Sequence, residues 1–235
     1  MTGTPPPADP AAPDHAQPNP DVAQIVVIDD HPIVRRGLIE LINDVDDLQV
    51  VGEAADVSTA MDILQEHQPD LALIDLSLGD GHGLELIKTI RAAGLTCKML
   101  VVSMMDEALY ADRVLRAGAS GYLRKEQATD NIIIAIRQVL GGEVYLSPSA
   151  TARVLNQVAT NEAPTKSPVE TLSDRELEVF EMLGDGQTSR EIAARLHLSV
   201  KTVETYREKI KAKLNLKNGS ELTRHAIHWV MRRGE

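Results

Sequence analysis

The chain has 235 residues, of which 43% are hydrophobic and 25% are charged, a composition typical of folded globular proteins. Only 3% are aromatic, so aliphatic side chains must form the cores. The single cysteine, Cys97, excludes an intrachain disulfide and fits a reducing compartment. No apolar run approaches the ~20 residues that a membrane-spanning helix needs. The first residues also lack the order of a signal peptide, so we expect a cytoplasmic protein with no membrane partner.

The charge is unevenly distributed along the chain. The formal net charge is −11, yet residues 171–235 carry 12 Lys and Arg against 10 Asp and Glu. Within 195–224, eight basic residues stand against three acidic ones. An acidic module is therefore followed by one that is able to face nucleic-acid phosphates, although a basic face is also common on proteins that bind no nucleic acid.

Changes in composition divide the chain into four parts. Residues 1–23 contain seven prolines and predict a disordered tail. Short apolar runs then alternate with segments of helical periodicity over residues 24–141. A Pro-, Thr- and Ser-containing linker is expected over 142–170, with a short helix near 149–158. A small helical unit is expected over 171–235.

Five short apolar runs within the first module predict β-strands. They are residues 25–28, 48–51, 71–74, 99–102 and 121–123. Three of them are almost wholly apolar, as is typical of parallel strands that are covered on both faces. Strands that alternate with helices predict a doubly wound α/β fold with a five-stranded parallel sheet, whose strand order the sequence leaves open.

Polar side chains stand where four of these strands end. Asp29 and Asp30 follow the first strand, Asp75 follows the third, Ser103 the fourth, and Lys125 the fifth. Carboxylates repel one another by about 4 kcal/mol per pair at 4 Å and an effective dielectric of 20. A divalent cation such as Mg²⁺ compensates this repulsion. Aspartate is also common in turns, but the five positions together favour a metal site beyond the carboxyl ends of the strands.

These residues resemble the receiver domain of two-component response regulators. The matching segments are IDDHP at 28–32, Asp75, Ser103 and GYLRK at 121–125. The resemblance covers residues 24–141. It implies a flavodoxin-like fold, a sensor histidine kinase as phosphodonor, and Mg²⁺ as cofactor.

The resemblance also assigns roles to single residues. Asp75 is implied as the phosphoacceptor. The implied Mg²⁺ ligands are Asp29, Asp30, Asp75 and the backbone carbonyl of Ser77.

Three further residues are implied to contact or sense the phosphoryl group. Ser103 would bond to it and Lys125 would pair with one of its oxygens. Tyr122 stands at the aromatic switch position, where the ring swings inward when Ser103 moves, although an ordinary rim aromatic explains it equally well. Many receivers have Met-Pro where this chain has Leu78-Gly79, and we expect this change to alter loop rigidity and phosphoryl lifetime without removing a reactive group.

The last part of the chain predicts a helix-turn-helix. Ser173 followed by Glu176 forms a capping-box pattern at a helix start. Residues 189–196 have the pattern of a short second helix, and Ser199 is a favourable N-cap for a third. Two helices joined by a tight turn, the second with basic residues, are typical of this motif.

The third helix has two distinct faces at 100° per residue. Val203, Tyr206, Arg207 and Ile210 fall on the core side. The outward residues expected to enter the DNA major groove are Lys201, Glu204, Thr205 and Glu208. The lysines expected to contact phosphates are Lys209, Lys211, Lys213 and Lys217.

This segment, from Leu172 to about Val230, resembles the LuxR-type output domain of the NarL/FixJ subfamily. The matching sequences are LSDRE at 172–176, SREIA at 189–193 and LSVKTV at 198–203. Tyr206 and Gly219 depart from the family's usual His and Arg. A helical bundle that binds only protein is the alternative to a DNA reader.

The family further implies that a fourth helix pairs with its twin in a homodimer that binds double-stranded DNA. The residues expected in that patch are Leu222, Ala226, Trp229 and Val230, which fit the interior of the monomer equally well. Phosphorylation would then control dimerisation and sequence-specific DNA binding to regulate transcription, with RNA polymerase as a further partner.

Two other functions compete with this transcription regulator. One is a Mg²⁺-dependent phosphatase or phosphotransferase with Asp75 as nucleophile, but such enzymes usually carry a second acid at the position of Ser77. We therefore expect no enzyme. The other is a DNA-binding protein whose receiver needs no phosphoryl group.

Overall fold

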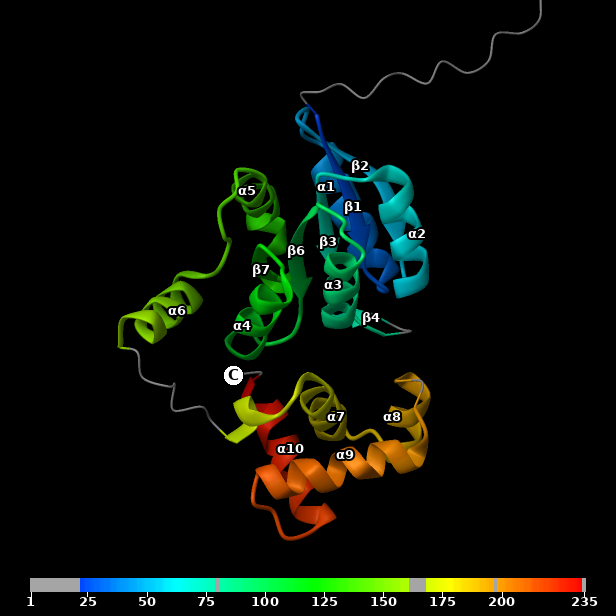
Figure 1. The fold of residues 1–235 in the computed structure, drawn as a ribbon, viewed down its shortest axis with the longest axis vertical. Coiled ribbons are helices and arrows are strands. Elements are labelled where there is room, and N and C mark those ends of the chain that lie inside the picture. Colours follow the sequence, from blue (N-terminus) through cyan, green and yellow to red (C-terminus); the bar gives the residue numbers. More distant parts are fainter. Residues whose placement is uncertain (1–21, 79–80, 161–167, 197, 234–235) are drawn as a thin grey trace, which may run out of the picture.

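The computed structural model describes residues 22–78, 81–160, 168–196 and 198–233 (Figure 1). Residues 1–21 of the expected tail therefore lie outside the described residues. So does Gly79, where many receivers have proline. In the described ranges, every helix is too short or too polar to cross a membrane.

The first module contains the expected parallel sheet. Its strands are β1 (Ala23–Ile28), β2 (Leu48–Ala54), β3 (Leu71–Ile74), β6 (Lys98–Ser103) and β7 (Gly121–Arg124). They pair in the order β2-β1-β3-β6-β7, which confirms the doubly wound five-stranded fold and supplies the strand order. A short antiparallel pair, β4 (Ser77–Leu78) and β5 (Gly81–His82), was not expected from the sequence.

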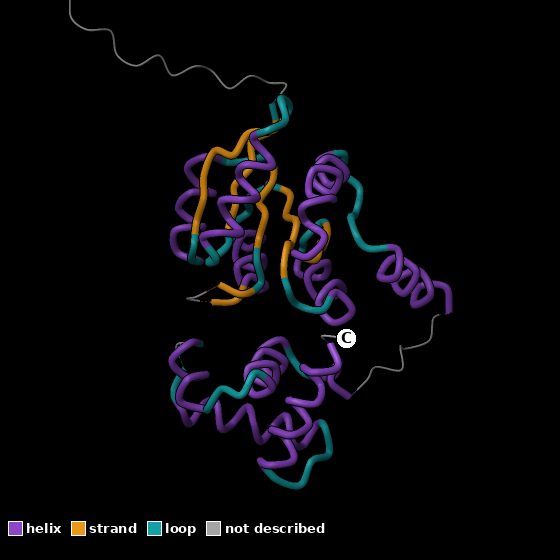
Figure 2. Tube along the Cα trace, turned by 180° about the vertical axis from the view of Figure 1, so that it is seen from behind, coloured by secondary structure: helices purple, strands orange, loops and turns teal. Residues whose placement is uncertain are grey.

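Helices cover both faces of this sheet. The helices on one face are α1 (Pro32–Asn43) and α5 (Ala128–Leu140), and those on the other are α2 (Val57–His67), α3 (Gly83–Ala92) and α4 (Glu107–Ala117) (Figure 2). Along β1, Ile25 and Val27 pack in the core that includes α1 and α5, whereas Val26 and Ile28 pack in the opposite core. The continuous apolar strands are thus explained by burial on two sides.

The remaining helices follow the receiver. They are α6 (Pro148–Thr160), α7 (Asp174–Gly184), α8 (Ser189–Arg195), α9 (Val200–Lys213) and α10 (Gly219–Arg233). Ser173 and Glu176 form the expected capping box, and Ser199 caps α9 through Thr202 N. A second capping box, between Thr188 and Glu191, starts α8.

The beginning of the expected linker packs on the receiver. Tyr145 O accepts a 2.8 Å hydrogen bond from Tyr122 N, and Tyr145 N donates to Ser120 O over 3.1 Å. The buried Glu107 of α4 accepts hydrogen bonds from the backbone and side chain of Ser147. Residues 143–147 therefore lie along the edge of β7.

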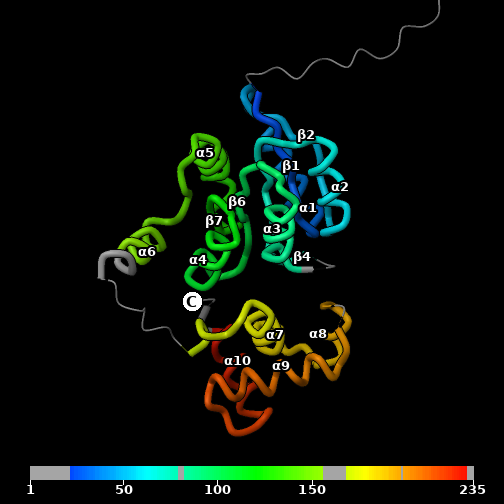
Figure 3. Tube along the Cα trace, viewed as in Figure 1, coloured from blue at the N-terminus to red at the C-terminus, as the bar shows by residue number. Residues whose placement is uncertain are grey.

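Contacts from α3 and α4 join the receiver to α7. Arg113 Nη1 lies 2.7 Å from Asp174 Oδ1, and Lys88 Nζ lies 2.9 Å from Asp174 Oδ2. The Tyr110 hydroxyl donates a 2.6 Å hydrogen bond to the buried Glu181. Helix α7 thus faces the receiver, whereas α9 lies on the far side of α7 (Figures 1 and 3).

Gly83 permits α3 to begin directly against the end of β3. A Cβ atom at this position would overlap the carbonyl oxygen of Asp75 and lie 2.8 Å from Leu76 Cα. The Gly83 N–H also donates to Leu76 O over 2.9 Å. The close approach depends on the missing side chain.

We expect Gly83→Ala to lower the free energy of unfolding by about 3 kcal/mol, because the new methyl group meets backbone atoms that cannot move away. Chemical denaturation monitored by circular dichroism measures the loss. Gly37→Ala is the matched control, since nothing lies within 4 Å of its Cβ position inside α1. That change should be neutral or raise stability by about 0.5–1 kcal/mol. Equal effects of both substitutions would contradict the packing argument.

Candidate functional site: an acidic pocket and a helix-turn-helix surface

The sheet places two carboxylates at one edge. Asp29 directly follows β1 and its N–H donates to Ala54 O over 3.0 Å. Asp75 directly follows β3 and its N–H donates to Ile28 O over 2.9 Å. Both residues are buried, so the strands hold two aspartates side by side with little access to water.

Lys125 compensates both charges. It directly follows β7, and its ammonium nitrogen lies 2.7 Å from Asp29 Oδ2 and 2.6 Å from Asp75 Oδ2. Burial opposes the charged form of Lys125, but Asp75 and Asp29 outweigh it and raise the lysine pKa. For Asp75, burial has the largest effect and raises the pKa, although Lys125 counteracts it.

Asp30 and His31 complete a group of possible metal ligands. One ligand atom from each of Asp29, Asp30, His31 and Asp75 lies within 4.8 Å of all the others. Asp29 Oδ2 and Asp30 Oδ1 are buried and accept no hydrogen bond of good geometry in the described structure, although Lys125 makes an ionic contact with the former. Clustered carboxylate oxygens that are not fully hydrogen-bonded are suited to a hard divalent cation, so the residues fit Mg²⁺.

Ser77 lies beside this group. Its backbone N–H donates to Asp75 Oδ1 over 3.2 Å, which keeps the start of β4 next to the carboxylate. Ser77, Asp75, Lys125 and His31 all line one cavity of about 720 Å³. The structure therefore brings together the expected phosphoacceptor, the expected ligands and the expected lysine.

Ser103 and Tyr122 are both linked to Met105. Ser103 is fully buried at the end of β6, and its Oγ accepts a 3.3 Å hydrogen bond from Met105 N. The Tyr122 hydroxyl donates to Met105 O over 2.6 Å. Tyr122 is also fully buried, so the ring already points inward and is not a rim aromatic. Sequence reasoning missed Met105 because its contacts use backbone atoms.

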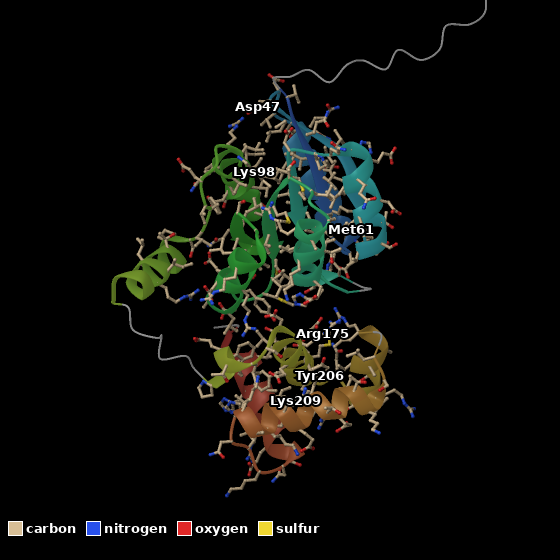
Figure 4. The ribbon with its side chains drawn as sticks, viewed as in Figure 1. Asp47, Met61, Lys98, Arg175, Tyr206 and Lys209 are labelled. Carbon is tan, nitrogen blue, oxygen red and sulfur yellow. The ribbon has the colours of Figure 1, made fainter. Side chains whose placement is uncertain are left out.

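The residues expected to enter the major groove lie on the exposed face of α9. Lys201, Glu204, Thr205 and Glu208 are exposed, while Val203 and Ile210 are buried. Tyr206 and Lys209 lie together on this helix, with the ammonium 5.7 Å from the ring centroid (Figure 4). Arg207 donates to Ser189 Oγ over 3.0 Å and thereby ties α9 to α8.

Two of the expected phosphate-binding lysines already have partners. Lys213 Nζ lies 2.5 Å from Glu176 Oε2, which is part of the capping box of α7. Lys211 Nζ lies 2.8 Å from Glu208 and is mostly buried. The Lys213 ion pair joins α9 to α7, although the Lys213 side chain is still 41% exposed. Lys209 and Lys217 are also exposed, so contact with phosphates stays a prediction for these lysines.

The expected dimer patch on α10 is largely internal. Leu222 and Ala226 are fully buried in the core of this module, and the Trp229 ring lies 5.5 Å from that of Phe180. A Cβ on Gly184 would lie 2.7 Å from Ala226 O, so α7 and α10 cross closely at this point. These three expected dimer residues therefore pack inside the monomer, the alternative that the sequence left open. Exposed apolar side chains on α10 instead include Ile227 and Met231.

Comparison with known proteins identifies two families in the chain. The response regulator receiver domain matches residues 25–137, and the luxR family of bacterial regulatory proteins matches residues 170–226. The oxygen regulatory protein NreC of Staphylococcus carnosus is 38% identical over 209 residues, which cover 87% of this chain and 96% of NreC. The chain is a LuxR-type response regulator. Its family consists of transcription regulators and not of enzymes, as expected.

Solved structures of response regulators resemble this one. A LuxR-family two-component response regulator from Aurantimonas is 33% identical, with a TM-score of 0.55 over 59% of this chain and 99% of that protein. RcsB from Salmonella enterica serovar Typhimurium, bound to the P1flhDC promoter in the presence of a phosphomimetic, is 25% identical with a TM-score of 0.63. That match covers 87% of this response regulator and 98% of RcsB.

We expect Asp75→Asn to stabilise the metal-free response regulator at neutral pH. Because the folded-state pKa of Asp75 is raised, its ionised form costs stability, and that cost grows as pH rises through this pKa. The melting temperature of the variant should exceed that of the wild type by roughly 2 °C or more at pH 7.5 in EDTA, with a smaller gap near pH 4.5. Differential scanning calorimetry measures both values.

The matched control is Asp62→Asn on the exposed side of α2, which should leave the melting temperature unchanged at both pH values. If the difference in melting temperature between Asp75→Asn and the wild type became larger toward acid pH, the raised pKa of Asp75 would be contradicted.

Proposed function

We propose that a sensor histidine kinase phosphorylates this protein on Asp75 in a Mg²⁺-dependent reaction, and that the phosphorylated form binds specific DNA sequences as a homodimer to regulate transcription. The observation that carries this proposal is the buried Asp75 carboxylate with Lys125 Nζ at 2.6 Å, together with Asp29 Oδ2 at 2.7 Å from the same ammonium nitrogen. The protein would act in the cytoplasm, with RNA polymerase as its partner at promoters.

The chemistry of the pocket suits phosphoryl transfer to a carboxylate. An Asp75 oxygen attacks phosphorus while the bond to the donor breaks, and repulsion between anions opposes this approach. The Lys125 ammonium would pair with a phosphoryl oxygen and offset part of the negative charge of the group. Asp29, Asp30, Asp75 and the Ser77 carbonyl would hold Mg²⁺, which supplies further neutralisation of the phosphoryl oxygens.

The bonds at Met105 suggest how the signal leaves the pocket. A phosphoryl group adds negative charge and strong acceptor oxygens, so the Ser103 hydroxyl gains an acceptor for its proton. Turning toward that acceptor would move Ser103 Oγ relative to Met105 N, from which it accepts the 3.3 Å hydrogen bond. The Met105 carbonyl also holds Tyr122, so loss of one bond disturbs the other. Met105 directly precedes Asp106, the N-cap of α4, and the change is thus passed to this helix.

Helix α4 also carries the contacts to the output domain. Tyr110 and Arg113 hold Glu181 and Asp174 of α7, so a shift of α4 would bias this contact between two states. The outer face of α9 is exposed while the contact is made. Control by dimerisation is therefore better supported than masking of the reading helix.

An exposed stripe on α10 offers the surface for this dimer. Thr223, Ile227 and Met231 follow one another at a spacing of four residues, and Ile227 and Met231 are exposed apolar side chains. Pairing two readers on an inverted repeat raises the apparent affinity through effective concentration. RcsB, which is bound to a promoter in the presence of a phosphomimetic, supports DNA binding by the phosphorylated form.

We expect selection from a random double-stranded DNA pool to recover a defined motif only with acetyl phosphate and Mg²⁺. The wild type should also shift toward a dimer in sedimentation under these conditions, whereas Asp75→Asn should do neither. Asp62→Asn is again the matched control and should behave as the wild type. If Asp75→Asn bound and dimerised like the wild type, the receiver would need no phosphoryl group for DNA binding.

A second test compares Lys217 with Lys213, which forms an ion pair with Glu176. We expect Lys217→Ala to weaken binding to all sequences by a similar factor and to reduce the slope of log K against log salt by about 1. Lys213→Ala should instead lower the melting temperature with little change in slope, because its charge pairs with Glu176. Fluorescence anisotropy at several salt concentrations measures the slope. An unchanged slope for Lys217→Ala would remove this residue from the interface.

A further inference from the structure

His31 points its Nδ1 atom at all three carboxylates of the acidic pocket. This nitrogen lies 2.7 Å from Asp30 Oδ1, 3.3 Å from Asp29 Oδ1 and 3.8 Å from Asp75 Oδ2. The roles assigned so far to Asp75, Lys125 and the aspartates do not require it. An imidazole directed into a group of carboxylates adds a nitrogen donor to an otherwise all-oxygen ligand set.

The backbone holds His31 in this position. Its N–H donates to Asp29 Oδ1 over 2.8 Å, and its carbonyl accepts a 3.0 Å hydrogen bond from Arg35 N at the start of α1. Pro32, the residue after His31, occupies the first position of the helix, where the fixed φ angle of proline is favourable. The side chain makes no capping bond of its own, so nothing in the helix start accounts for the direction of the ring.

A proton shared between His31 and Asp30 is the simplest competing explanation. Asp30 Oδ1 is buried and accepts no hydrogen bond of good geometry within the described residues, although Nδ1 is only 2.7 Å away. The two atoms are therefore close without the geometry of a hydrogen bond. One ligand atom from each of His31, Asp30, Asp29 and Asp75 lies within 4.8 Å of all the others, a spacing that a single metal ion can bridge.

The lysine and His31 contact the carboxylates largely through different oxygens. Lys125 contacts Oδ2 of Asp29 and Oδ2 of Asp75, whereas His31 Nδ1 is nearest to Oδ1 of Asp30 and Oδ1 of Asp29. Asp75 Oδ2 lies near both, 2.6 Å from the ammonium nitrogen and 3.8 Å from the imidazole nitrogen. A cation bound next to His31 would therefore use Oδ1 of Asp29 and Oδ1 of Asp30, which the ammonium does not contact.

We propose that His31 is an additional metal ligand of the phosphorylation pocket and makes it favour Mn²⁺ over Mg²⁺; the proposal extends the Mg²⁺-dependent function inferred above. Mg²⁺ takes oxygen ligands in a strict octahedron and gains little from an imidazole. First-row transition cations accept imidazole nitrogen together with carboxylates, so the nitrogen changes their affinity selectively. The prediction is a difference in selectivity, not only in strength.

The test compares the full-length wild type with His31→Gln. We expect the variant to bind Mn²⁺ about tenfold more weakly by titration calorimetry, and Mg²⁺ within about twofold of the wild type. Pulsed electron paramagnetic resonance of bound Mn²⁺ should show coupling to ¹⁴N in the wild type and lose it in the variant. His67→Gln, at an exposed position of α2, is the matched control and should change neither result.

Several outcomes would overturn this assignment. Equal loss of Mn²⁺ and Mg²⁺ affinity would show that His31 only positions Asp30, and the absence of ¹⁴N coupling in the wild type would exclude it as a ligand. Phosphorylation of Asp75 by acetyl phosphate with Mg²⁺ is measured in parallel. Normal phosphorylation without ¹⁴N coupling rejects the role of His31 alone, whereas ¹⁴N coupling without phosphorylation under any cation rejects the proposed function alone.

Discussion

The charge balance between Lys125 and two buried aspartates is the interaction on which the functional end of the receiver depends. Asp29 and Asp75 would repel each other strongly in a site with so little water. One ammonium group, within 2.7 Å of an oxygen on each, makes the pair tolerable without a bound cation. The same arrangement leaves Asp30 outside the reach of the ammonium, and Asp30 Oδ1 is buried without a hydrogen bond in the described structure. This incomplete compensation suits the pocket to bind further positive charge.

Much of the fold was predictable because burial on two faces leaves a simple pattern. The run 71–74 coincides with β3, and the other four predicted runs lie inside observed strands. The strand order was not predictable, because it depends on how helices cross the sheet and not on any single run. The β4–β5 pair was missed because two-residue strands carry no periodicity.

The candidate site was predictable only as far as chain connectivity determines it. Residues that directly follow parallel strands must meet at one edge, so Asp29, Asp75 and Lys125 were expected together. Side-chain direction and partner choice are decided by packing. Lys213 pairs with Glu176, and Leu222 lies in the core, which the sequence left open as an alternative to a dimer surface. Contacts through backbone atoms, such as those of Met105, leave no residue-type signal.

The segment around Tyr145 limits how copies of this protein are able to associate. A strand at the end of a sheet normally exposes backbone groups that recruit a strand from another chain. Here Tyr145 bonds to the backbone of Ser120 and Tyr122, and Gly121 has no side chain to keep the two backbones apart. The β7 border is thereby sealed against intermolecular sheet extension, and self-association on this flank must proceed through helical surfaces.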